Sequence, residues 1–443
     1  MQKNQDMNLI VPQNPIKKVG IVGSGLGAFM AYIVLRFRGL SASDIAVIGP
    51  AASPLKGWLT LVRAIGQTSM RSESAAHFFP TDSPGLATIE SLKNWTIKPT
   101  IMNWFDKYHP AVDVIVNHVN KLSRQSGYGA SLVQARVTNI RRHGPYMHVF
   151  GEDGQLLGMY ENLIIAIGHG ELRIPDAVKN FITQHPQDNR VRHSFQAGKA
   201  IKPGETVLIM GNGLSSATHW TNFLDEDASV IAVAPTKFIM NQPLNTPRKY
   251  FSKRGFDTYR QQADLTRLTE LMDAKRGTFP PYINWHLKFA KARRRAHLQE
   301  IMGSVEDIQQ LNGRLQAIIR LPDGHGLTAV AADHIIASTG FMPAASHPLW
   351  QTLIKQYSLP TMGTCLITDD HFRVPALSQK GSIVGVIGSA SEWAIPCADS
   401  FGGMKIAAHE LAVQMLGKES WSPSRISKQV GRWVKLMTGQ KLN

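Results

Sequence analysis

Two apolar runs, each followed by a Gly-x-Gly turn, constrain the fold of this chain most strongly. The first run, Lys18-Val19-Gly20-Ile21-Val22, leads into Gly23-Ser24-Gly25-Leu26-Gly27-Ala28 and then into a mostly apolar stretch up to Phe37. A continuous apolar run is typical of a strand buried in a parallel sheet, and a stretch apolar on all sides is typical of a helix packed beneath it. Because another apolar run follows at 45–48, the pattern predicts a β-α-β unit.

The small residues of this first turn have distinct physical roles. Gly23 allows a tight turn, Gly25 lets the backbone approach a pyrophosphate, and Ala28 lets the helix pack closely. The N–H groups at the helix N-terminus then face the phosphates. The unit therefore predicts a dinucleotide site, against the alternative that the glycines serve only the turn.

The same unit recurs about 190 residues later. An apolar run at 206–210 precedes Gly211, Gly213 and Ser216, which take the three small-residue positions, and a second apolar run follows at 229–233. A strand before and a helix after each turn are what the binding mechanism requires, so two copies are hard to explain by turn geometry alone. The sequence predicts two dinucleotide sites.

Each unit is expected to continue through an antiparallel ribbon into a return strand that ends in glycine, Gly168 in the first and Gly340 in the second. The expected ribbon strands are 136–140, 146–150, 314–321 and 327–331. A last buried strand ends at Gly388, and Phe401-Gly402-Gly403 opens a helix that runs to about Leu416.

These elements predict an α/β protein with two Rossmann-like three-layer domains. Residues 1–170 and 340–443 are expected to form the first domain, and 171–339 the second, which is inserted in the first. A helical region is expected between Ser252 and Ile301 within the insertion.

Composition narrows the classes of function. Hydrophobic residues make up 43% of the 443 residues and charged residues 18%, so most of the chain is expected to be globular. The two cysteines, Cys365 and Cys397, form no C-x-x-C, which excludes a dithiol redox centre of that type and a four-cysteine zinc site; no metal site is predicted. Without a signal pattern or a run of about 20 apolar residues, a soluble cytoplasmic protein is expected.

In the order and spacing of these landmarks the sequence resembles the two-dinucleotide-binding flavoprotein superfamily, and within it the single-component flavin monooxygenases and N-hydroxylating monooxygenases. The resemblance covers nearly the whole chain. It implies FAD on the first fold, NADPH on the second and hydride transfer between them. The cofactor-binding positions that follow are Gly23, Gly25, Gly27, Ala28, Gly168, Gly211, Gly213, Ser216, Lys237, Gly340, Gly388, Ser389, Phe401 and Gly402.

The sequence departs from that superfamily at three places. The second strand of the first fold ends in Gly49, where an acidic residue usually contacts the FAD ribose, and the usual Gly-Asp pair near the ribityl chain reads Gly388-Ser389. Around His193, the aromatic-x-Gly and the Trp/Tyr-Pro that mark flavin-containing and Baeyer–Villiger monooxygenases are missing.

The end of the second fold's second strand bears on the choice of nicotinamide cofactor. Pro235-Thr236-Lys237 supplies a cation, and no carboxylate, where a ribose 2′-phosphate would lie. This favours NADPH over NADH, with a solvated lysine as the alternative. Arg248 and Lys249 are further candidates for phosphate contacts.

In a flavin enzyme the cofactor carries the redox chemistry, so no protein nucleophile is expected. The resemblance favours oxygen as the electron acceptor, with a flavin hydroperoxide that inserts oxygen into a small organic substrate. One alternative is a reductase that passes electrons to a quinone or a protein carrier. Another is a non-catalytic flavin-binding subunit.

Three residues are the candidates for catalytic roles. Arg71 would neutralise charge on the reduced flavin or a phosphate, Gln67 would hydrogen-bond the ring, and His193 would lie at a hinge between the folds. The structural alternatives are an arginine satisfied by local carbonyls and a histidine packed at the domain junction. The helix opened by Phe401 and Gly402 would point its N-terminal dipole at the flavin.

The formal net charge is +16, and two basic segments contribute to it, 288–295 and 421–441. The second has apolar residues at helical spacing and could contact an anionic membrane surface weakly, although a docked helix with a solvated basic face is favoured. No recognisable nucleic-acid module is present, so no specific nucleic-acid partner is predicted. The oligomeric state is left open.

Overall fold

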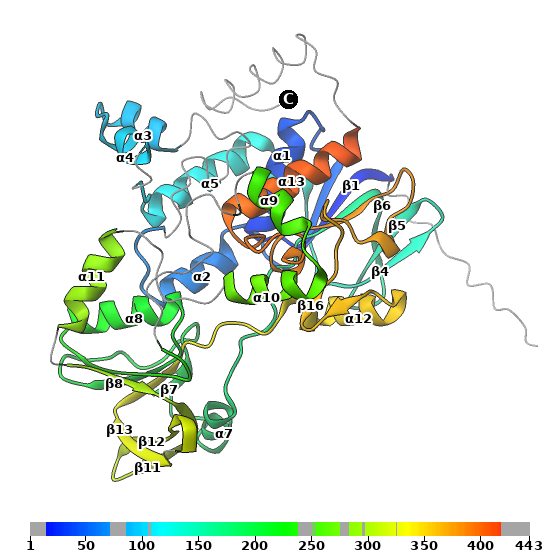
Figure 1. Cartoon of the computed structure of the whole chain (residues 1–443). Helices are drawn as coiled ribbons and strands as arrows, with labels where there is room; N and C mark the ends of the chain where they lie inside the picture. Colours follow the sequence, from blue (N-terminus) through cyan, green and yellow to red (C-terminus); the bar gives the residue numbers. More distant parts are fainter. Residues whose placement is uncertain are drawn as a thin grey trace, which may run out of the picture.

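The computed structural model describes residues 15–70, 86–104, 108–237, 250, 253–274, 283–294, 297–324 and 326–417. Figure 1 shows two lobes, each built around a mostly or wholly parallel sheet. The predicted pair of Rossmann-like folds is therefore confirmed. The chain builds part of the first sheet, then the second, and then returns to the first, because β17 (Val384–Val386) pairs with β6 (Leu156–Ile165).

The first sheet is centred on β1 (Lys17–Val22), which pairs in parallel with β2 (Ile45–Gly49) and with β6. The sheet has seven strands in the order β3-β2-β1-β6-β5-β4, and β17 joins at β6. The outer strands are β3 (Leu132–Gln134), β4 (Val137–His143) and β5 (Tyr146–Gly151). The predicted ribbon is confirmed as β4 and β5, but the expected return strand begins earlier than predicted. The first part of β6 pairs with β5 and thereby adds a third strand to the ribbon. The later part of the same strand pairs with β1.

Helices cover both faces of the first sheet (Figure 1). On one face α1 (Leu26–Phe37) packs beside α13 (Phe401–Leu416), and both bury apolar side chains against Val19 and Ile21. On the other face α12 (Pro348–Tyr357) buries Trp350. The remaining helices of this part are α2 (Lys56–Ala64), α3 (Leu86–Lys93), α4 (Lys98–Trp104), α5 (Val112–Ser126) and α6 (Tyr128–Ser131). Short strands β15 (Thr361–Met362) and β16 (Cys365–Leu366) form a separate pair.

The second sheet is parallel throughout, in the order β10-β9-β8-β14-β7. One face packs against α8 (Leu214–Asp225) and α11 (Ile283–Arg293), and the other against α7 (Asp176–Gln184) and a small antiparallel sheet. The parallel strands are β7 (Val191–His193), β8 (Thr206–Met210), β9 (Ser229–Ala234), β10 (Leu298–Met302) and β14 (His334–Ala337). The antiparallel strands are β11 (Ser304–Leu311), β12 (Arg314–Arg320) and β13 (Leu327–Ala332), so the second predicted ribbon is also confirmed.

The region expected to be helical differs from the prediction in two respects. Its end forms the edge strand β10, which pairs in parallel with β9. Its helices α9 (Lys253–Arg260) and α10 (Asp264–Ala274) pack on the first fold, where Arg267 donates to the Trp393 carbonyl (2.9 Å) and to Asp370 Oδ1 (2.8 Å). The domain limits remain a prediction. Helices α9 and α10 lie within the range 171–339 that was predicted for the second domain, but they contribute to the core of the first fold.

Two chain segments cross between the folds side by side. The N–H of Arg173 donates to the Gly340 carbonyl (3.0 Å), and the N–H of Met342 donates to the Glu171 carbonyl (2.7 Å). Leu172 and Phe341 form an antiparallel bridge between these contacts. The junction is therefore a short two-stranded link.

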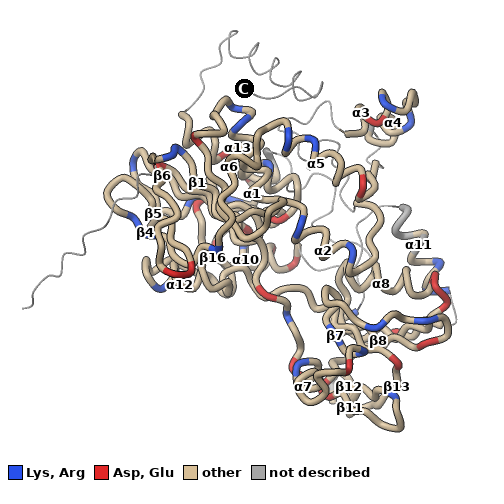
Figure 2. Tube along the Cα trace, turned by 180° about the vertical axis from the view of Figure 1, so that it is seen from behind, with Lys and Arg blue, Asp and Glu red and all other residues tan. Residues whose placement is uncertain are grey.

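Basic residues are spread over both folds and not gathered on one face (Figure 2). In the segment 288–295, Arg293 pairs with Glu300 at 2.6 Å, while the predicted amphipathic segment 421–441 lies outside the described residues. In the parts of the chain that the structure describes, none of the helices combines the length and the apolar character that crossing a bilayer requires.

Candidate functional site

The first Gly-x-Gly turn lies at the carboxyl end of β1. Gly23 has φ +117°, and a Cβ there would lie 2.2 Å from the Ala166 carbonyl oxygen. Gly25 is the N-cap of α1 without a side-chain cap, and within the described ranges no protein atom lies within 4 Å of a Cβ built on Gly25. An open space therefore faces the helix N-terminus, whose first N–H groups lack partners within the helix.

The second turn repeats this geometry at the carboxyl end of β8. Gly211 has φ +110°, and a Cβ there would lie 2.6 Å from the Ser338 carbonyl oxygen. Gly213 caps α8 with φ −85° and ψ −177°, close to the −87° and −166° of Gly25, and the space beside it is again open. Two turns far apart in the sequence thus have nearly the same backbone, and both fit a pyrophosphate.

The third fingerprint position is a small, buried residue in each fold. Ala28 and Ser216 are both fully buried, as close packing of helix on sheet requires. The Ser216 hydroxyl has no hydrogen-bond partner among the described residues. Gly27 serves packing as well, because a Cβ there would lie 3.3 Å from Sδ of Met404 in α13.

The absence of an acidic residue at the end of β2 has a steric reason. A Cβ on Gly49 would lie 2.5 Å from Ser24 Oγ and 2.6 Å from Ser24 N, because the first turn lies directly against the end of the strand. Ser24 Oγ accepts a hydrogen bond from the N–H of Ala51 at 3.0 Å, which ties the turn to the chain after β2. No side chain fits at Gly49 without moving the turn, so a contact to a ribose would come from elsewhere.

At the end of β9, Lys237 follows a turn that is tied to the second Gly-x-Gly loop. Asn212 Nδ2 donates to Thr236 Oγ1 at 2.9 Å, while Lys237 itself is exposed. The structure thus places a cation, without a neighbouring acidic residue in the sequence, at the edge of the second turn. Arg248 and Lys249 lie outside the described residues.

Gly388 and Ser389 lie beside the end of β6. Ser389 Oγ donates to the Gly168 carbonyl at 2.6 Å, so the hydroxyl that replaces the usual carboxylate is engaged with the protein. Gly168 and Gly340 have φ +81° and +75°, which places a left-handed residue where each return strand leaves its sheet. These positions are brought together around the junction between the two folds.

The helix start at Phe401 and Gly402 is confirmed. Ser400 Oγ accepts from the N–H of Gly403 at 3.0 Å, so the N-cap is a serine that precedes the predicted start. Gly403 is required for packing, because a Cβ there would lie 1.9 Å from the Cys397 carbonyl oxygen. The dipole contribution of this helix to a flavin stays a prediction.

The three candidate catalytic residues differ in how far the structure describes them and in their environment. His193 is fully buried, and its Nδ1 accepts from the N–H of Phe195 at 3.3 Å. Burial lowers the pKa of His193, while the backbone of Gly340 acts in the opposite direction. Gln67 donates to the nearby Ser69 carbonyl at 2.9 Å, and Arg71 lies outside the described residues. Their catalytic roles remain predictions.

A row of stacked rings, absent from the predictions, connects the ends of three strands at the junction. His169 stacks on Phe341 at 4.6 Å between ring centroids, and Phe341 stacks on Phe195 at 5.3 Å. His169, Phe341 and Ser389 line a cavity of about 300 Å³. A sequence signal was available, since His169 and Phe341 directly follow Gly168 and Gly340.

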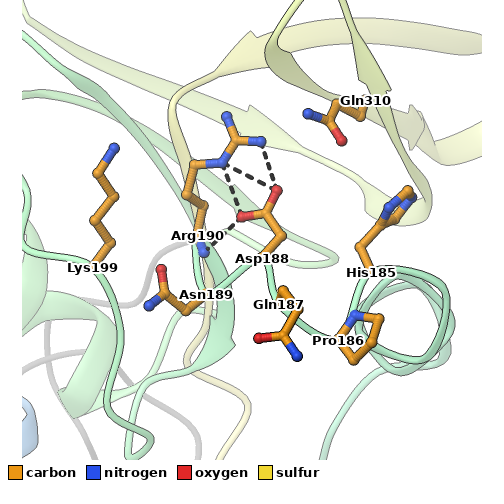
Figure 3. A pocket seen from close by; sticks show the side chains of 8 residues that line it. All are labelled: His185, Pro186, Gln187, Asp188, Asn189, Arg190, Lys199 and Gln310. Carbon is orange, nitrogen blue, oxygen red and sulfur yellow. Dashed lines mark hydrogen bonds and ion pairs between the residues drawn. The ribbon is translucent and has the colours of Figure 1, made fainter.

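A polar pocket of about 450 Å³ lies at the other end of the second sheet, where α7 leads into β7 (Figure 3). Its charged centre is already paired, because Arg190 donates to Asp188 through Nε at 2.9 Å and through Nη2 at 2.6 Å. His185, Lys199 and Gln310 surround this pair. We assign the pair a structural role, since each charge has its counter-ion within the pocket.

Asp188→Asn is expected to lower the free energy of unfolding by about 1 kcal/mol near pH 7. Hydrogen bonds from Arg190 hold the pKa of Asp188 below its usual value, so the carboxylate stabilises the fold above the unfolded pKa of about 4. That contribution is lost as the pH falls through the lowered folded pKa. Urea unfolding of both proteins between pH 7 and pH 3 should show the difference shrinking, and a difference constant with pH would contradict the electrostatic origin.

No family model matches the sequence. No curated protein matches it either. Solved structures do match: ornithine hydroxylase from Pseudomonas aeruginosa has a TM-score of 0.68 at 15% identity, over 90% of this chain and 99% of its own.

Two further structures agree with the first. An ornithine N-hydroxylase from Kutzneria sp. 744 has a TM-score of 0.68 at 14% identity, over 92% of this chain and 100% of its own. L-lysine 6-monooxygenase from Pseudomonas syringae has a TM-score of 0.63 at 17% identity, over 90% and 99%. The chain shares its fold with these three enzymes. At this level of identity the likeness establishes the fold alone. In each comparison the matched region spans nearly the full length of this chain and of the other protein.

Proposed function

We propose that this protein is an oxidoreductase that binds FAD on the first fold and NADPH on the second, and inserts one oxygen atom into a small organic substrate. The observation that carries the proposal is the pair of matching turns. Gly25 and Gly213 each cap a helix without a side-chain cap, and each faces space that a side chain would fill but that no atom of the described residues occupies. A pyrophosphate has the charge and size that such a turn accepts.

The residues at the junction would orient the two cofactors relative to each other. When bound, FAD would supply hydride acceptance from NADPH and the activation of oxygen. The turn at Gly23 and Gly25 would hold one pyrophosphate, and the turn at Gly211 and Gly213 the other. The stacked rings of His169 and Phe341 would line the space between the two and help to exclude water.

Similar solved structures support an amine as the first substrate class to test, since they are named as hydroxylases of ornithine and a monooxygenase of lysine. The overall reaction would consume one NADPH, one proton and one O₂ for each substrate. It would yield NADP⁺, one water and the oxygenated product. Both electrons from NADPH thus serve to reduce one of the two oxygen atoms to water.

The decisive experiment mixes the purified protein anaerobically with NADPH, follows the flavin absorbance, and then admits oxygen with and without basic amino acids or diamines. We expect bleaching by NADPH and, with the right amine, consumption of oxygen that exceeds the peroxide released. Reoxidation with full release of peroxide for every substrate tried would instead favour a reductase with another acceptor. Failure to bind flavin would overturn the cofactor assignment, and flavin without NADPH oxidation by any acceptor would favour a non-catalytic subunit.

Lys237→Glu is expected to raise the KM for NADPH at least about 10-fold and to change the KM for NADH little, because only NADPH carries the 2′-phosphate that a cation attracts. Steady-state NAD(P)H oxidation measures both constants. Lys202→Glu is a matched control, because Lys202 is an exposed lysine in the turn before β8, at the opposite end of the strand from the Gly211 turn. An equal rise of both constants in Lys237→Glu would exclude a contact with the phosphate.

A further inference from the structure

A cavity of about 970 Å³ lies between the two folds, apart from both Gly-x-Gly turns. Its walls come from α2 and α5 of the first fold and, from the second fold, the segment 195–201 and the C-terminal part of α8, which lies beside α2 (Figure 1). Phe223 lines the cavity and lies ten residues after Gly213 in the sequence. At 1.5 Å per helical residue, Phe223 lies about 15 Å along α8 from the Gly213 end of that helix.

The two walls are held against each other by a specific contact. Asn222 Nδ2 donates to the carbonyl oxygens of Ile65 and Gly66 at 3.1 Å and 3.2 Å, at the end of α2. Gly66 has φ +62°, and a Cβ on it would lie 2.7 Å from Asn222 Nδ2. A side chain at Gly66 would push the two walls apart. The shape of the cavity therefore depends on the close contact between Asn222 and the end of α2.

Its charged lining is strongly unbalanced. Four basic residues line the cavity, and the only carboxylate among the lining residues is Glu226. None of the four forms an ion pair within the described parts of the chain. The four are Lys56, Arg63, Arg192 and Lys199. A group of cations that outnumbers the carboxylates of a concave site attracts anions.

Arg192 is the least solvated of these cations. It is half-buried, a Cβ on Gly198 would lie 2.3 Å from its Cδ, and its Nη1 reaches only the Lys199 carbonyl, at 3.5 Å. Burial lowers the pKa of Arg192, and none of the described carboxylates counteracts this effect. A desolvated guanidinium without a counter-ion is suited to bind an anionic group through two parallel hydrogen bonds.

Apolar side chains form part of the remaining wall, beside polar residues such as Thr60 and Gln196. Leu59 on α2, Phe195 after β7 and Phe223 on α8 face the cavity together with smaller apolar residues. The cavity volume is in the range of small-molecule sites. We propose that this cavity binds an organic phosphate with an apolar body, whose phosphate lies on Arg192 and Lys199 and whose apolar part packs against Phe195 and Phe223. This site goes beyond the proposed redox function and does not depend on it.

The test is isothermal titration of the full chain, as purified, with octyl phosphate below its micelle concentration. Octanol, which has the same apolar body, serves as the uncharged comparison. We expect one site for octyl phosphate, at least about 10-fold weaker binding of octanol, and at least about 10-fold weaker binding of octyl phosphate to Arg192→Gln. Arg320→Gln is the control, because Arg320 is an exposed arginine paired with Glu306 on the small antiparallel sheet and its loss changes the net charge equally.

Three outcomes would overturn the proposal. Equal weakening by Arg320→Gln would show that the general positive field binds the probe, and equal binding of octanol would show that the cations play no part. Displacement of octyl phosphate by NADPH with simple competition would place the probe at the Gly211 turn. Thermal melting establishes that each variant is folded, and if Arg192→Gln fails this criterion, Lys199→Gln, an exposed side chain on the same wall, replaces it in the titration.

Discussion

Gly25→Ala is expected to give a folded protein that retains little or no FAD. An added methyl group at Gly25 meets no atom of the described residues within 4 Å, and the residue has φ −87°, which alanine adopts readily. The methyl group would, however, occupy the space in front of the helix N-terminus, where a pyrophosphate must come close to the backbone. Overpacking of this kind costs about 1–3 kcal/mol, so the affinity for FAD should fall about 10- to 100-fold.

Three measurements separate loss of the cofactor from loss of the fold. They are the ratio of flavin to protein absorbance after purification, titration of the flavin-free protein with FAD, and thermal melting of the flavin-free form. Gly23→Ala is the contrasting variant, because its Cβ would lie 2.2 Å from the Ala166 carbonyl oxygen and the residue has φ +117°. We expect that variant to fail to accumulate as folded protein. Wild-type affinity for FAD in Gly25→Ala would show that the first turn does not hold the cofactor.

Gly213→Ala should retain FAD and lose efficient reduction by NADPH. Its environment matches that of Gly25, because no atom in the part of the chain that the structure describes lies within 4 Å of an added Cβ, so the fold should be preserved. The same overpacking should raise the apparent dissociation constant for NADPH about 10- to 100-fold. Anaerobic stopped-flow measurement of flavin bleaching at increasing NADPH concentration gives this constant directly.

The two variants together test whether each fold binds its own cofactor, because each should impair one cofactor and leave the other unaffected. Gly25→Ala should impair flavin retention, while Gly213→Ala should leave the flavin spectrum unchanged. Gly211→Ala, whose Cβ would lie 2.6 Å from the Ser338 carbonyl oxygen, should destabilise the second fold itself. If Gly213→Ala lost FAD instead, the assignment of the two cofactors to the two turns would have to be reversed.

Much of the architecture was predictable because its signals are local. A strand, a glycine-rich turn and a helix follow one another within about twenty residues, and each residue type meets a steric demand of that short segment. The left-handed φ of Gly23 and Gly211 and the burial of Ala28 and Ser216 are therefore found where the motif places them. The helix that begins at Phe401 was predictable for the same reason.

Elements whose state depends on distant partners were predicted less well. Residues 298–302 form a strand only because β9 offers a parallel edge to pair with, and local pattern does not encode that edge. Helices α9 and α10 were expected with the second fold, yet Arg267 anchors them to the first through Trp393 and Asp370. The partners of these two contacts are separated by 103 and 126 positions in the sequence. Contacts of such long range produce no periodic pattern in the sequence.

The sequence by itself determined that this chain forms two nucleotide-type folds, since repeated motifs with short-range steric demands specify them. Only the tertiary structure decided why Gly49 bears no acidic side chain, because that reason is the contact between the end of β2 and Ser24. It likewise decided that His169, Phe341 and Phe195 stack, and that the cations of α2 and of Arg192 face one cavity. These features arise from packing between segments far apart in the chain, where geometry, and not residue type, determines which side chains meet.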